Sequence, residues 1–159
     1  MCVEGVFPYA TANIVRCGMN NTEDARKTIL VVEDDPDMSE LICSVLSSAG
    51  YSIVSVDNGE KGLEKAHQIK PDLILLDIML PCMDGIEVCR SITTNDDTKR
   101  IPVIMVTIKR ELSTKLASYI AGARRYITKP FGIDELLGEV QKTLRQNELT
   151  ETSSERTYI

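Results

Sequence analysis

Histidine is scarce in this chain of 159 residues, and its cysteines follow no regular spacing. It contains one histidine, His67, and five cysteines: Cys2, Cys17, Cys43, Cys82 and Cys89. A zinc site needs closely spaced cysteine or histidine ligands, so this set argues against zinc binding. An odd, unpatterned set of cysteines also argues against a disulfide framework. It favours reduced thiols and a cytoplasmic location.

Long apolar runs and a strong charge imbalance are also missing. No apolar run approaches the roughly 20 residues of a membrane-spanning helix, so membrane insertion is not expected. The segment Met1 to Asn20 lacks a basic cluster followed by an apolar stretch, which argues against a secretory signal. The net charge of -6 argues against nonspecific binding to nucleic acid. With 43% hydrophobic and 26% charged residues, the composition is typical of one globular domain with some spare length.

The chain is expected to divide into three parts. Residues 1–27 show no sustained periodicity and are predicted to be a mobile extension, with Met19 as the hypothesised native start. Residues 28–145 carry the pattern of a folded domain. Residues 146–159 are polar and are predicted to be a frayed tail.

Short apolar runs alternate with amphipathic stretches through the folded part. The runs predict buried strands at Thr28–Val32, Tyr51–Val56, Leu73–Leu76, Val103–Val106 and Arg125–Ile127. A helical stripe follows each run, and the first helix is predicted to start at Pro36, with Asp35 as its cap, and to stop at Gly50. Alternating strands and helices make parallel β-α-β units, which predicts an α/β fold with a five-stranded parallel sheet and five helices.

Polar side chains follow four of these strands at the point where each strand ends. They are Glu33, Asp34 and Asp35 after the first strand, Asp77 after the third, Thr107 after the fourth and Lys129 after the fifth. Because the ends of parallel strands share one sheet edge, we expect these side chains to lie together. Clustered carboxylates repel unless a cation or protons intervene, and Mg2+ prefers such oxygen ligands. A carboxylate can also attack a phosphoryl group, so the edge predicts a phosphoryl receptacle.

Each of these residues has a plainer explanation when it is taken alone. Asp35 could be only a helix cap, Asp77 only a loop opener, and Tyr126 only a strand residue that packs in the core. Their joint occurrence at successive strand ends favours the functional interpretation.

Five motifs resemble the receiver domain of two-component response regulators, as in chemotaxis regulators, in both order and spacing. They are Val31-Val-Glu-Asp-Asp-Pro36, Leu75-Leu-Asp-Ile-Met-Leu-Pro81, Met83-Asp-Gly85, Val106-Thr107 and Tyr126-Ile-Thr-Lys-Pro-Phe131. The resemblance spans about Thr28 to Arg145. It implies a flavodoxin-like, doubly wound parallel sheet with strand order 2-1-3-4-5.

The resemblance also implies a role for each matched residue. Asp77 would accept a phosphoryl group from the phosphohistidine of a sensor histidine kinase or a phosphotransfer protein. Thr107 and Lys129 would contact that group. The Mg2+ ligands would be Glu33, Asp34, Asp77 and the backbone carbonyl of Met79.

By the same resemblance, phosphorylation would shift a two-state equilibrium through Thr107 and Tyr126. The readout would be a downstream protein that binds the face made by the fourth helix, fifth strand and fifth helix; a homodimer stays open. Direct contact with nucleic acid or a membrane is not expected of this chain. Nor is it expected to be an enzyme, beyond promoting its own phosphorylation and dephosphorylation.

Three places depart from the family pattern. Ile108 follows Thr107 where a small residue is usual, which predicts slower turnover of the acyl phosphate. Cys82 replaces a frequent glycine, which predicts a different loop shape. Arg124 and Arg125, with basic residues nearby in sequence, predict a basic output face and an acidic partner.

Two other functions stay open. An aspartate-nucleophile phosphohydrolase of the haloacid-dehalogenase type also uses aspartate, threonine, lysine and Mg2+. It expects a second acid two residues after the nucleophile, where this chain has Met79. The second open function is an interaction module that has the same fold but is not phosphorylated.

Overall fold

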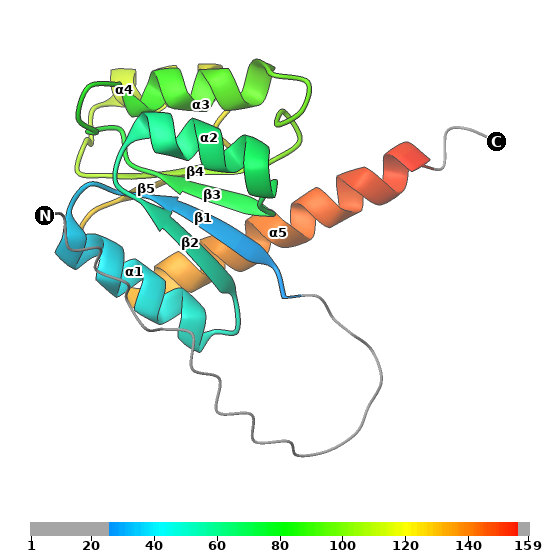
Figure 1. Cartoon of the computed structure of the whole chain (residues 1–159), viewed down its shortest axis with the longest axis horizontal. Helices are drawn as coiled ribbons and strands as arrows, with labels where there is room; N and C mark the ends of the chain where they lie inside the picture. Colours follow the sequence, from blue (N-terminus) through cyan, green and yellow to red (C-terminus); the bar gives the residue numbers. More distant parts are fainter. Residues whose placement is uncertain (1–25, 156–159) are drawn as a thin grey trace, which may run out of the picture.

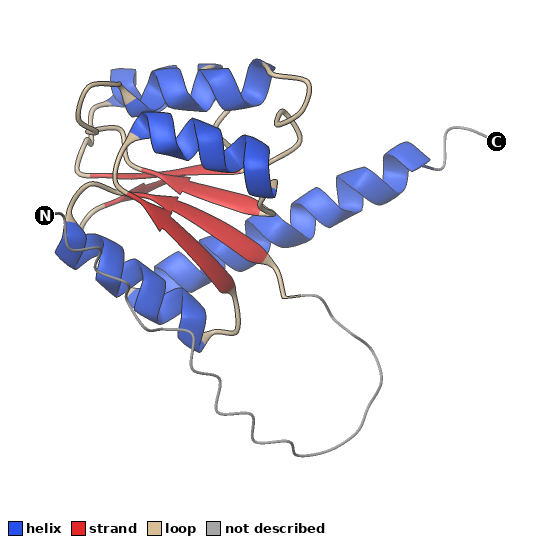
Figure 2. Ribbon diagram, viewed as in Figure 1, coloured by secondary structure: helices blue, strands red, loops and turns tan. Residues whose placement is uncertain are grey.

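The computed structural model describes residues 26–155, which form a five-stranded parallel sheet between two layers of helices (Figure 1, Figure 2). The strands are β1 (Thr28–Val32), β2 (Ser52–Val56), β3 (Leu73–Leu76), β4 (Val103–Thr107) and β5 (Arg125–Thr128). The helices are α1 (Pro36–Ser48), α2 (Gly59–Ile69), α3 (Gly85–Thr94), α4 (Leu112–Ile120) and α5 (Ile133–Glu155). The strand order is β2-β1-β3-β4-β5, which confirms the doubly wound, flavodoxin-like fold expected from the resemblance.

The central strands are apolar throughout because helices cover both faces of the sheet. Every residue of β3 and β4 is buried. On one face, α1 and α5 pack Ile42, Leu46 and Leu136 against the sheet. On the other, α2 and α3 contribute Ala66 and Ile92 to a second apolar layer. A strand buried on both faces reads as an unbroken apolar run, which is why these strands could be predicted.

The first helix begins and ends where the sequence predicts. The Asp35 side chain accepts hydrogen bonds from the backbone N–H groups of Asp37, at 3.0 Å, and Met38, at 3.4 Å. Pro36 is the first helical residue, where its missing N–H leaves no bond unmade. Gly50 follows the helix with φ +98°, a backbone conformation that favours glycine. The connection from β1 into α1 is therefore fixed by local chemistry.

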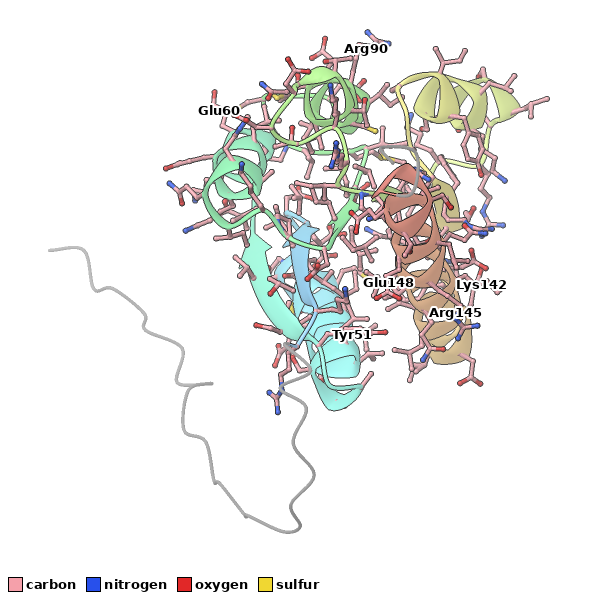
Figure 3. All side chains as sticks on the ribbon, turned by 90° about the vertical axis from the view of Figure 1, so that its right-hand side faces the viewer. Tyr51, Glu60, Arg90, Lys142, Arg145 and Glu148 are labelled. Atoms are coloured by element: carbon pink, nitrogen blue, oxygen red, sulfur yellow. The ribbon has the colours of Figure 1, made fainter. Side chains whose placement is uncertain are left out.

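The last helix is longer than predicted. The prediction of a frayed tail from residue 146 was wrong for residues 146–155, which continue α5 to Glu155. The continuation is tied back to the domain, because Lys27 Nζ lies 3.1 Å from Glu148 Oε1. Figure 3 shows Lys142, Arg145 and Glu148 along this helix. No glycine or proline follows Gly138, so nothing in the sequence ends the helix earlier.

The predicted N-terminal extension lies outside the described residues, except for Arg26 and Lys27. Within residues 26–155, none of the helices combines the length and apolar character that a membrane span requires. The cytoplasmic location stays a prediction.

Candidate functional site

The ends of β1 and β3 bring Glu33 and Asp77 to one edge of the sheet. The Glu33 N–H donates to the Val56 carbonyl at 3.1 Å, and the Asp77 N–H donates to the Val32 carbonyl at 3.1 Å. These bonds continue the sheet pairing by one residue beyond each strand. The two carboxylates therefore start from a backbone that the sheet holds in place.

Lys129 joins these two acids in a buried ion-pair network. Its Nζ lies 2.5 Å from Glu33 Oε2 and 2.9 Å from Asp77 Oδ2. The exposed fractions are 4% for Glu33, 6% for Asp77 and 8% for Lys129. Buried charges are tolerated only when they are paired, so the ammonium and the two carboxylates stabilise one another. We call Glu33, Asp34, Asp77 and Lys129 the acid–lysine cluster.

Burial and pairing act on the protonation of the cluster in opposite directions. Burial lowers the pKa of Lys129, but hydrogen bonds to Glu33 and Asp77 outweigh it, and the pKa of Lys129 is raised above its ordinary value. Lys129 therefore stays an ammonium at neutral pH. Burial raises the pKa of Glu33, while the hydrogen bond from Lys129 opposes that change.

The three acids of the cluster also have the geometry of a cation site. One carboxylate oxygen each from Glu33, Asp34 and Asp77 lie within 4.8 Å of one another. Glu33 and Asp77 are buried, whereas Asp34 is exposed and borders the solvent. A set made of oxygen donors alone suits a hard divalent cation such as Mg2+, which keeps part of its water shell.

The second oxygen of Asp77 turns toward the loop after β3. Asp77 Oδ1 accepts a hydrogen bond from the Met79 N–H at 3.1 Å, while Oδ2 faces Lys129. The Met79 side chain is 48% exposed and borders a cleft of about 540 Å³ that Asp34 and Lys109 also line. The predicted role of the Met79 backbone carbonyl as a metal ligand stays a prediction.

Thr107 and Tyr126 contact the same loop, between β4 and α4. The fully buried Thr107 Oγ1 accepts from the Lys109 N–H at 3.4 Å. The Tyr126 hydroxyl donates to the Lys109 carbonyl at 2.6 Å, and Lys115 Nζ lies 5.5 Å from its ring centre. Burial, followed by the charge of Glu111, raises the pKa of Tyr126 to about 12, so its hydroxyl remains a donor. The two predicted switch residues are thus joined through one loop.

Gly85 is a site residue whose role sequence reasoning did not find. A Cβ atom at Gly85 would lie 2.0 Å from the Asp77 carbonyl oxygen and 2.6 Å from Ile78 Cα. The Gly85 N–H also donates to the Ile78 carbonyl at 2.9 Å. Only glycine allows this close approach, which positions the backbone of Asp77. The Met83-Asp-Gly85 motif is the sequence signal, but it carries no indication of what the glycine touches.

Cys82 occupies the left-handed conformation expected of glycine. Its φ is +66°, and the residue is exposed. Residue 82 therefore has a backbone conformation that favours glycine, although it carries a side chain. The prediction that this loop differs in shape from that of related domains stays a prediction.

Of the two arginines that were predicted to form a basic output face, Arg125 is already paired within the domain. Arg125 Nε lies 3.6 Å from Glu139 Oε2, and its Nη2 donates to Gln146 at 3.0 Å. Arg124 is exposed. The helix that precedes these arginines, α4, exposes the apolar side chains of Leu112, Leu116 and Ile120. An acidic partner for this face stays a prediction.

The fold and the site define a class: a flavodoxin-like domain with an acidic, lysine-containing cluster at the carboxyl edge of its sheet. Comparison with known proteins gives the family. The family model described as the response regulator receiver domain matches residues 29–141, and the chain belongs to this family. It is a receiver domain of two-component response regulators.

Relatives agree with this assignment. The DNA-binding dual master transcriptional regulator RpaA of Synechocystis is 40% identical over 120 residues, which cover 76% of this chain and 50% of the relative. The alkaline phosphatase synthesis regulator PhoP of Bacillus subtilis is 40% identical over 129 residues, which cover 81% and 53%. The chain thus spans about half the length of these curated relatives.

Solved structures match over nearly their whole length. A response regulator from Chloroflexus aurantiacus superposes with a TM-score of 0.73 at 34% identity, covering 76% of this chain and 98% of that one. The receiver domain of the sensor histidine kinase PA1611 from Pseudomonas aeruginosa superposes with a TM-score of 0.70 at 32% identity, with the same coverage. That structure is described with a magnesium ion coordinated in its active-site cleft.

Proposed function

We propose that this chain is a phosphorylatable switch in which Asp77 accepts a phosphoryl group. The observation that carries the proposal is the cluster itself: Lys129 Nζ bridges Glu33 Oε2 at 2.5 Å and Asp77 Oδ2 at 2.9 Å, with Asp34 close by. In the transfer, an Asp77 carboxylate oxygen forms a bond to phosphorus as the bond from phosphorus to the donor histidine nitrogen breaks. The donor is a sensor histidine kinase or a phosphotransfer protein.

Glu33, Asp34 and Asp77 would hold Mg2+, and the Met79 carbonyl is proposed as a further ligand. The bound ion supplies charge compensation for the phosphoryl oxygens. Lys129 supplies a second, fixed positive charge from inside the domain, and its raised pKa keeps that charge in place. We also propose that the same residues promote the chain's own phosphorylation and dephosphorylation.

The proposed output runs through the loop between β4 and α4. Once Asp77 is phosphorylated, the Thr107 hydroxyl is drawn to the phosphoryl oxygens, and its contact with the Lys109 N–H changes. Tyr126 bonds the carbonyl of that same residue, so the change reaches the face of α4, β5 and α5. A downstream protein that binds this face, or a second copy of the chain, would read the phosphorylated state.

The test is incubation with acetyl phosphate and Mg2+, followed by intact mass spectrometry of wild type and Asp77→Asn. We expect one phosphoryl adduct on the wild type and none on the variant. A parallel NMR titration with beryllofluoride should shift resonances of Thr107 and Tyr126. An adduct that persists in Asp77→Asn contradicts the proposal, and steady turnover of a generic phosphate ester would support a phosphohydrolase instead.

A further inference from the structure

The loop of residues 108–111 is fastened by three hydrogen bonds. Two join Lys109 to the switch residues: its N–H donates to Thr107 Oγ1 at 3.4 Å, and its carbonyl accepts from the Tyr126 hydroxyl at 2.6 Å. In the third, Arg110 Nη2 donates to the backbone carbonyl of Lys129 at 3.3 Å. The loop thus contacts the backbone of the residue whose ammonium binds Glu33 and Asp77.

Helix α4, which follows the loop, has little packing of its own to hold it. Within the described chain, Ser118 is its one buried residue, and the Ser118 hydroxyl donates to Thr114 of the same helix at 2.9 Å. Glu111, at the N-terminal cap position, makes no capping hydrogen bond through its side chain among the described residues. The position of the N-terminal end of α4 therefore depends mainly on the hydrogen bonds of the preceding loop.

The far end of α4 is fixed independently of the loop. Thr93 Oγ1 donates to the Ala121 carbonyl at 2.6 Å, just beyond the last turn, and Cys89 Sγ lies 3.6 Å from the same oxygen. A helix held at its C-terminal end and weakly packed along its length can move mainly at its N-terminal end. That end adjoins Arg110.

We propose that Arg110 is a positioning residue of the switch: its bond to the Lys129 carbonyl holds the loop in the arrangement in which Tyr126 reaches Lys109. The inference rests on the proposed function for its biological meaning. Arg110 contacts a backbone carbonyl rather than Asp77 or Glu33, so it acts on the loop and not on the phosphoryl chemistry. Because Arg110 is exposed, water competes for this bond, and a shift of roughly three- to tenfold in the loop equilibrium is expected on its loss.

The chain offers a direct reporter for this equilibrium. It has five tyrosines, so fluorotyrosine labelling gives few fluorine resonances, and Tyr126→Phe assigns the one of interest. Arg110→Ala removes the bond, and Arg110→Lys keeps a donor on a similar stem. Arg124→Ala is the control, because Arg124 is also an exposed arginine but lies beyond the other end of α4, just before β5.

In Arg110→Ala we expect the Tyr126 resonance to move toward that of a solvent-exposed tyrosine, with partial return in Arg110→Lys and no change in Arg124→Ala. The rate of phosphorylation by acetyl phosphate with Mg2+ should stay within about twofold of wild type. An unmoved Tyr126 resonance in Arg110→Ala overturns the inference. A large loss of phosphorylation rate in Arg110→Ala also overturns it, because Arg110 would then act on the phosphoryl chemistry. If the wild type itself takes up no phosphoryl group, the proposed function fails, while the Tyr126 resonance still tests the bond.

Discussion

The acid–lysine cluster and helix α4 are two regions of the same signalling domain, and they are built in opposite ways. In the cluster, Lys129, Glu33 and Asp77 are buried and bonded to one another. On α4, Leu112 is 72% exposed and Ile120 is 81% exposed. The difference teaches that the fold holds the proposed reacting groups in place through buried bonds, whereas α4, the proposed readout element, has few buried contacts to hold it.

The largest expected effect comes from breaking the cluster. Lys129→Met leaves two carboxylates buried without their partner, which should lower the free energy of unfolding by about 3 to 5 kcal/mol at neutral pH. Urea unfolding measures this. Lys142→Met, at an exposed position of α5, is the control, with an expected loss below about 1 kcal/mol. Equal losses in the two variants would mean that the cluster does not stabilise the fold.

A side chain at Gly85, which contacts the backbone of Asp77, should destabilise the protein nearly as much. In Gly85→Ala the new methyl group would meet the Asp77 carbonyl oxygen at 2.0 Å, so the backbone must shift. We expect a loss of at least about 2 kcal/mol in unfolding free energy and slower phosphorylation. Gly138→Ala in α5 meets nothing within 4 Å among the described residues and should instead gain about 0.5 to 1 kcal/mol. A Gly85→Ala protein with wild-type stability and rate would refute the contact.

Ile108 lies at the boundary between the two regions, directly after Thr107, and is 59% exposed. If its branched side chain limits access to the phosphoryl group, Ile108→Ala should speed loss of that group several-fold, which is about 1 kcal/mol in barrier height. The decay of phosphorylated protein, followed by mass spectrometry, measures this. Unchanged rates of phosphorylation and decay would remove Ile108 from the mechanism.

The pH dependence of stability sharpens the description of the cluster. Burial raises the pKa of Glu33, so protonation of this carboxyl favours the folded state. This contribution to stability is fully present below the ordinary value of 4.5 and is lost as pH rises through the pKa of the folded state. Glu33→Gln stays neutral at every pH. Its stability relative to wild type should therefore improve as pH rises above 4.5. Unfolding curves in metal-free buffer test this, and a difference that stays flat with pH would contradict it.

The smallest effect is expected on α4. Leu116 is 52% exposed, so Leu116→Ala should change the free energy of unfolding by less than about 0.5 kcal/mol. The buried Leu46 of α1 is the matched comparison, because Leu46→Ala should lose about 2 to 5 kcal/mol. Similar losses at the two positions would mean that α4 is packed as firmly as α1.

Much of the site could be predicted from sequence because it depends on strand ends. A parallel sheet brings its carboxyl ends together, so the order of elements alone placed Asp77, Lys129 and Thr107 at one edge. The ion pairs among Lys129, Glu33 and Asp77 then follow from burial and charge. Their roles in phosphoryl transfer and metal binding remain proposals.

Other features depend on loop geometry, which no periodic pattern encodes. The contact of Gly85 with the Asp77 carbonyl and the bond of Arg110 to Lys129 join residues through irregular backbone. The apolar stripe of α4 also looks like that of a packed helix, although the structure leaves Leu112 and Ile120 exposed. Periodicity identifies a helix but does not say how firmly its apolar side is covered.

The most direct measurement traps the phosphoryl group where it is attached. Borodeuteride reduces an aspartyl phosphate to labelled homoserine, and peptide mapping then locates the label after incubation with acetyl phosphate and Mg2+. We predict label at Asp77 alone, and none when Mg2+ is removed by a chelator. Label on Asp34 or Glu33, or label at Asp77 that is independent of Mg2+, would contradict the assignment of the acid–lysine cluster as a metal-assisted phosphoacceptor site.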